Sequence, residues 1–165
     1  MKKILLILFS CFTYAVAHAE DGYRLWLRYE KINDSKLLQE YQRTISSLLF
    51  TDTSATLFAA KEELVNGMQG LLGKTIPTTD KITDRTILAG TGSNATIYSI
   101  ISANVFDKLG KEGFTIQSAT INGNRIIVVA ANSDIGVLYG CFYLLRLLQT
   151  HQPVQKLAIV SSPAA

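Results

Sequence analysis

Residues 112–149 read EGFTIQSATINGNRIIVVAANSDIGVLYGCFYLLRLLQ, and this stretch predicts two strands and a helix in succession. Side chains over 114–119 alternate in character, as in a strand. Asn122-Gly123 then supplies the two residues with positive φ that a tight hairpin turn needs. The returning arm, 125–130, is apolar at nearly every position, which is typical of a strand covered on both faces. We therefore expect a hairpin whose second strand is central in its sheet.

The polar triplet Asn132-Ser133-Asp134 is typical of a helix start, and the residues after it are apolar on two stripes. The stripes consist of Ile135, Leu138, Phe142 and Leu145, and of Val137, Cys141, Leu144 and Leu148. One stripe can face the sheet while the other needs a different cover, so we expect this helix to contact another structural unit. Its uncharged run, 135–145, has 11 residues and is too short to span a membrane, which takes about 20.

The remaining chain predicts further strands and helices in an α/β order. In chain order these elements are an extended N-terminal strand over 23–29, a short helix over 36–41, a strand over 45–50, a helix from the caps at 52–54 to Gly73, a short strand over 86–89, a helix from 95 to 109 closed by Gly110, and a last strand over 155–160. Together with the hairpin, they give an α/β (α+β) fold. We expect a mixed sheet of about four to five strands with three main helices.

The first 19 residues have the layout of a secretory signal. Lys2-Lys3 precedes an apolar run that ends before Ala17-His18-Ala19, a small-x-small cleavage site. We expect cleavage before Glu20 and export to the periplasm or the medium. A lipoprotein signal is the alternative; its lipidated residue would be Cys11, but the preceding Phe9-Ser10 matches that pattern poorly.

Cleavage removes two lysines and no acidic residue, which lowers the formal net charge from +3 to +1. A balance so close to neutral does not indicate a nucleic-acid partner. We expect residues 20–161 to form one domain, with 162–165 as the start of a linker, and no membrane span after cleavage.

Candidate chemistry in the mature chain is sparse. Cys141 lies on the apolar helix and predicts a small buried hydrophobe, and a metal site is not expected with His151 as the one remaining histidine. Gly90-x-Gly92-x-x-Ala95 is placed like a dinucleotide fingerprint but lacks the acidic residue at the end of the next strand. The adjacent Glu62 and Glu63 point in different directions on their helix and predict a solvated face. We expect no catalytic residue and no cofactor.

Three segments resemble the N-terminal domain of bacterial xylan-degrading α-glucuronidases. Residues 132–150, NSDIGVLYGCFYLLRLLQT, resemble the end of that domain. Residues 20–29, EDGYRLWLRY, resemble its start, and 63–73 resemble its first helix. The resemblance covers nearly all of the mature chain.

This resemblance implies a non-catalytic α/β domain that precedes a catalytic (β/α)8 barrel, its partner. The barrel and its catalytic carboxylates have no counterpart in these residues, so the chain alone is expected to be inactive. The parent enzyme would be an inverting glycoside hydrolase that removes (4-O-methyl)glucuronic acid from glucuronoxylan-derived xylo-oligosaccharides. The chain would be an excerpt, a truncated product or part of a split protein.

Five residues are candidates for an interface or a saccharide contact. Trp26 is flanked by Arg24 and Arg28, and an aromatic face beside cations suits a sugar ring or an acidic saccharide. The same three residues suit an anchor between the N-terminus and its neighbour. Tyr139 and Phe142 lie on the helix that needs a second cover.

Two other functions remain open. The chain could be a free-standing secreted binding module for acidic saccharides that uses Trp26, Arg24 and Arg28. It could also be the N-terminal domain of a β-hexosaminidase-type enzyme, which shares the architecture. The stretch 21–29 favours the glucuronidases over the hexosaminidases.

Overall fold

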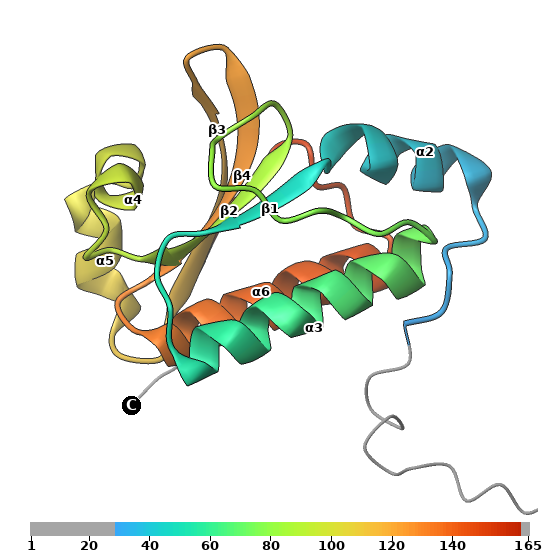
Figure 1. Ribbon diagram of the computed structural model, residues 1–165. Coiled ribbons are helices and arrows are strands. Elements are labelled where there is room, and N and C mark those ends of the chain that lie inside the picture. The colour runs from blue at the N-terminus through green and yellow to red at the C-terminus, as the bar shows by residue number, and fades with distance from the viewer. Residues whose placement is uncertain (1–28, 163–165) are drawn as a thin grey trace, which may run out of the picture.

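The hairpin predicted at Asn122-Gly123 lies at the centre of the sheet in the computed structural model, which describes residues 29–162 (Figure 1). β3 (Phe114–Ile121) and β4 (Asn124–Ala131) pair antiparallel along their whole length. Asn122 and Gly123 have φ of 49° and 84°, as the tight turn requires. The predicted hairpin is therefore confirmed.

Five strands form one mixed sheet in the order β1-β2-β4-β3-β5. β1 (Ser47–Phe50) and β2 (Thr86–Thr91) run parallel to β4, and β5 (Ala158–Ser161) runs antiparallel to β3. β4 is the middle strand and is buried from residue 126 to 131, which confirms that it is central. The sheet also confirms the predicted α/β fold class.

β5 begins at Ala158 and not at Gln155, where the sequence places the start of the last strand. The N–H of Leu157 donates to the side-chain Oγ of Ser118 at 2.9 Å, although the Leu157 carbonyl accepts from the Ser118 N–H. Because this side-chain bond takes the place of a backbone bond at Leu157, the regular ladder of β5 starts one residue later, at Ala158.

Two long helices, α3 (Ala55–Leu72) and α6 (Asp134–Gln149), lie side by side under one face of the sheet (Figure 1). Ser54 caps α3, which ends at Gly73 with φ 62°, as predicted. The cap of α6 is Ser133, whose Oγ accepts from the Gly136 N–H at 3.3 Å. Asp134 is the first residue of the helix, where its negative charge interacts favourably with the positive end of the helix dipole.

The prediction of a single helix over 95–109 is wrong, because the chain there forms two short helices. α4 (Ala95–Ile100) and α5 (Ala103–Leu109) are separated by Ile101, whose φ of −97° and ψ of 124° are extended. The break brings Phe106, which is 7% exposed, into the core instead of the half-buried Val105. Both helices cover the sheet face opposite α3 and α6, where a second, smaller core forms.

The edges of the sheet are covered unequally. α2 (Ser35–Thr44), longer than the predicted 36–41, lies near the start of β1 (Figure 1), and the buried Tyr41 donates its hydroxyl to the Gln152 carbonyl at 2.7 Å. The loop after α3 pairs with β1 through an isolated bridge between Leu48 and Thr78. β5 forms the opposite edge of the sheet.

α6 lies unusually close to the sheet at two glycines. A Cβ on Gly136 would lie 2.5 Å from the Gly113 carbonyl oxygen and 2.7 Å from the Ala131 Cβ. A Cβ on Gly140 would lie 2.6 Å from Cγ1 of Val129 on β4. The close approach of helix and sheet therefore depends on the missing side chains.

We expect Gly136→Ala to lower the free energy of unfolding by about 1–2 kcal/mol, because its new methyl group meets backbone that cannot move aside. Helix propensity alone would favour alanine by about 1 kcal/mol. Urea unfolding of both variants measures the effect, with Asn66→Ala on the exposed side of α3 as the control that propensity should stabilise. A Gly136→Ala variant at least as stable as the wild type would contradict the packing argument.

Candidate functional site

The two stripes of α6 have different environments. The stripe that contains Val137, Cys141 and Leu148 is fully buried against the sheet, as predicted. On the other stripe Leu145 is also buried, because Gly67 of α3 lies directly against it. The rest of that stripe is only partly covered within the described residues.

We define the α6 outer face as Ile135, Leu138, Tyr139 and Phe142. Tyr139 is 39% exposed, and the other three side chains are half-buried. Their spacing is i, i+3, i+4 and i+7, so they form one continuous stripe on the helix. The structure thus places both predicted interface residues of α6, Tyr139 and Phe142, on the same partly open apolar face.

Tyr29 packs along α3. Its hydroxyl donates a hydrogen bond to Oε1 of Glu63, and its side chain lies against Gly67 and Gly70 of α3. Burial, followed by the hydrogen bond and the charge of Glu63, raises the pKa of Tyr29. Glu62 is solvent-exposed as predicted, but the same prediction is wrong for Glu63, which is half-buried and accepts the hydrogen bond of Tyr29.

Trp26, Arg24 and Arg28 lie outside the described residues. Their proposed contact with a saccharide or a neighbouring domain stays a prediction. The predicted strand over 23–29 also lies outside that range, apart from Tyr29.

The glycines at 90 and 92 are required by neighbouring side chains. A Cβ on Gly90 would lie 1.9 Å from the Thr51 Oγ1, and one on Gly92 would lie 2.8 Å from the Phe106 ring. Thr51 also donates to Oδ2 of Asp52 at 2.9 Å, so the carboxylate of Asp52 already has a hydrogen-bond partner. The geometry is that of a plain turn between strand and helix, not of a dinucleotide site.

The described carboxylates have structural roles at several positions. Asp34 accepts from the N–H groups of Lys36 and Leu37 as the cap of α2, and these bonds lower its pKa. Cys141 is fully buried, as predicted, and burial raises the pKa of its thiol. Over residues 29–162, no group of three or more His, Cys, Asp or Glu side chains could hold a metal ion. No helix in the same range is long and apolar enough to cross a membrane.

A charged cluster lies at the end of the sheet where the inner strands β2 and β4 begin. Asp84 accepts three hydrogen bonds from Arg125, at 2.7 Å from Nη2, 3.1 Å from Nε and 3.0 Å from the backbone N–H. These bonds hold the pKa of Asp84 at about 2. This pair was not predicted from the sequence. The sequence nevertheless contains a signal for it. Asp84 lies just before β2 and Arg125 lies near the start of β4, and these parallel neighbouring strands begin at the same end of the sheet.

Asp84 should therefore make stability depend on acid pH. Its pKa is lowered in the folded state from 3.8 to about 2, so its contribution is present above the unfolded value and disappears as pH falls toward 2. We expect the difference in unfolding free energy between wild type and Asp84→Asn to shrink from about pH 5 to about pH 2. Asp107→Asn, at an exposed position on α5, is the matched control. A constant difference for Asp84→Asn over this range would contradict the role of the ion pair.

The chain resembles known proteins over most of its length. The family model described as "Glycosyl hydrolase family 67 N-terminus" matches residues 25–144. Alpha-glucuronidase A of Emericella nidulans (strain FGSC A4) is 28% identical over 169 residues, which include 100% of this chain and 19% of the relative. The chain thus spans about a fifth of the length of that curated relative.

One solved structure supports the fold. It is described as a novel family GH115 4-O-methyl-α-glucuronidase with specificity for decorated arabinogalactans. The match has a TM-score of 0.53 and 20% identity, and covers 72% of this chain and 18% of that one. The family match over residues 25–144 confirms the resemblance found in the sequence: the chain belongs to the N-terminal domains of glycosyl hydrolase family 67.

Proposed function

We propose that the chain is the non-catalytic N-terminal domain of an exported α-glucuronidase. The parent enzyme removes (4-O-methyl)glucuronic acid from xylo-oligosaccharides by inverting hydrolysis. The chain packs through the α6 outer face against a catalytic (β/α)8 barrel of the same protein. The observation that carries this proposal is the continuous, partly open apolar stripe of four residues on α6, a helix that is already buried on its other side.

Two observations support catalysis outside this domain. Glycoside hydrolysis usually needs two carboxylates on either side of the scissile bond. Several described carboxylates are instead held by the fold itself: Asp34 caps a helix, Asp84 pairs with Arg125, and Glu63 binds Tyr29. The curated relative is also about five times longer than this chain, which leaves room for a separate catalytic domain.

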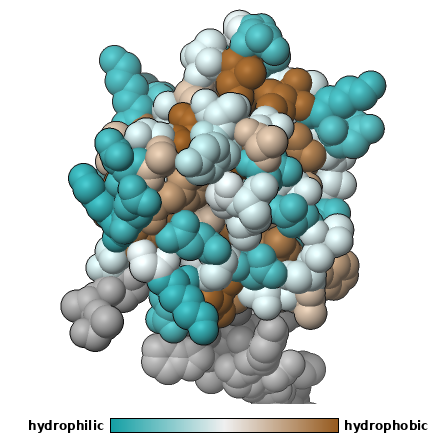
Figure 2. Space-filling view, turned by 90° about the vertical axis from the view of Figure 1, so that its left-hand side faces the viewer, coloured by the Kyte–Doolittle hydropathy of each residue, from teal (hydrophilic) through white to brown (hydrophobic). Residues whose placement is uncertain are grey.

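Other surfaces offer less for docking. Figure 2 views the molecule from the side of α4 and α5, where hydrophobic and hydrophilic residues are interspersed. Tyr98 on α4 is exposed but stacks on Phe106, with 5.9 Å between the ring centroids. Phe58 on α3 is 61% exposed and lies beside Lys61 and Asp80 in a hollow at the β1 edge that both polar and apolar side chains line. The α6 outer face is the longer apolar stripe.

We expect the purified chain alone to release no glucuronic acid from aldouronic acids, because the catalytic carboxylates belong to the barrel. Addition of the catalytic part of the parent enzyme should restore release. Product chromatography measures both reactions. Release by the chain alone would overturn the non-catalytic assignment.

A charge placed on the α6 outer face should weaken docking. We expect Tyr139→Glu to reduce the affinity of the chain for the catalytic part of the parent about tenfold or more, because a carboxylate would be buried in an apolar contact. Phe58→Glu, an aromatic-to-glutamate change on α3, is the matched control and should leave affinity unchanged. Calorimetry measures both, after thermal unfolding shows that the variants are folded. Equal losses for the two variants would contradict docking through α6.

A further inference from the structure

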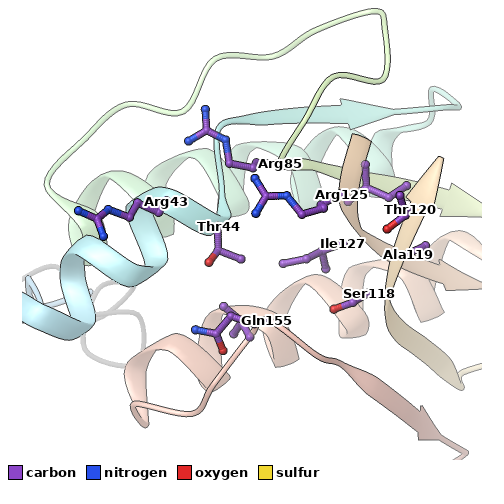
Figure 3. Close-up of a pocket in the computed structure, with 11 residues that line it drawn as sticks. Arg43, Thr44, Arg85, Ser118, Ala119, Thr120, Arg125, Ile127 and Gln155 are labelled. Atoms are coloured by element: carbon purple, nitrogen blue, oxygen red, sulfur yellow. The ribbon is translucent and has the colours of Figure 1, made fainter. Parts of the chain in front are cut away.

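A cleft opens between the end of α2, the turn end of the hairpin and the segment before β5 (Figure 3). Its volume is about 350 Å³, within the range of small-ligand pockets. Three arginines from separate parts of the chain line it: Arg43 on α2, Arg85 before β2 and Arg125 on β4. The tertiary fold therefore gathers three cations that are far apart in sequence.

The cations of this cleft are only partly compensated. Asp84, the nearby carboxylate, is engaged by Arg125 in a two-pronged ion pair. Arg85 places its Nε 3.6 Å from the same carboxylate, but this buried nitrogen has no hydrogen-bond partner among the described residues. Arg43 has no ion pair within residues 29–162. Among the described residues, Arg43 and the terminal nitrogens of Arg85 thus have no hydrogen-bond partner and can donate to an anion.

The backbone of Arg85 is in an unfavourable conformation. Its φ is 69°, in the left-handed region that suits glycine and strains a residue with a long side chain. The backbone is held there by two bonds, from the Arg85 N–H to the Arg125 carbonyl and from the Ser46 N–H to the Arg85 carbonyl. Glycine would satisfy the same two bonds without strain. Strain at such a position is typical of functional sites, where the side chain itself is required.

The other polar lining groups suit a sugar. Ser118, Thr120 and Gln155 contribute hydroxyl and amide groups to the lining beside apolar Ala119 and Val154, and the Ser118 Oγ, which accepts from the Leu157 N–H, can still donate. Hydroxyl and amide groups pair with sugar hydroxyls, and the planar guanidinium fork pairs with a carboxylate through two hydrogen bonds. We propose that this cleft binds a uronate, a sugar of monosaccharide size that carries a carboxylate. The proposal goes beyond the proposed function, which needs no ligand on this domain.

Titration of the purified chain with sodium glucuronate tests this site, with binding followed by NMR chemical shifts. We expect saturable binding that weakens as salt is raised, because the attraction is largely electrostatic. D-Glucose, which lacks the carboxylate, should not bind. Sodium acetate, which lacks the hydroxyls, should bind about tenfold more weakly or not at all. Absence of glucuronate binding, or equal binding of acetate and glucuronate, would overturn the proposal.

Two variants and a matched control locate the binding. Arg85→Gly and Arg43→Ala should each weaken glucuronate binding about tenfold, through the loss of charge-assisted hydrogen bonds. Arg85→Gly should unfold at the same or a higher temperature than the wild type, since glycine fits this backbone. Arg146→Ala removes an exposed arginine of α6 and should leave binding unchanged. Wild-type affinity in Arg85→Gly, or an equal loss in Arg146→Ala, contradicts the site. These experiments do not test the proposed docking of the catalytic barrel on the α6 outer face, so the two proposals can fail separately.

Discussion

The direct contact between α6 and the central strands joins the layer formed by α3 and α6 to the sheet. α6 has no side chain at Gly136 and Gly140, so its backbone comes close to Ala131 and Val129 of β4. Branched and long apolar side chains then fill the space around this contact from α3, α6 and the sheet. The hairpin strand β4 can be covered on both faces because α6 closes one face at this short distance.

The same helix connects the core of the domain to its surface. A helix buried on one side usually has a polar opposite side, but α6 stays apolar along its outer face. α3 covers Leu145, and Tyr29 extends over α3 through its bond to Glu63. What remains open is a stripe that a neighbouring domain can bury without any change in the domain itself. The packing of the core and the proposed docking surface thus belong to one segment.

Local signals in the sequence predicted much of this fold. The Asn122-Gly123 turn, the serine caps at 54 and 133, and the glycine at the end of α3 each act within a few residues. The break at Ile101 was missed because the spacing of Ile97, Ile101 and Val105 fits a continuous helix. Tertiary packing decides it, since burial of Phe106 outweighs that local pattern. For the candidate site, the apolar stripe on α6 could be predicted from local spacing. The bond between Tyr29 and Glu63 and the arginine cleft could not, because they join residues that are distant in sequence.

The structure of the whole parent enzyme is the most direct test of the central claim. The solvent exposure of Ile135, Tyr139 and Phe142 is the quantity to measure there. Our account predicts that these side chains lose most of their exposure to the catalytic domain. If they stay as exposed as they are in this domain, while α4 and α5 make the contact instead, the proposed role of α6 is wrong.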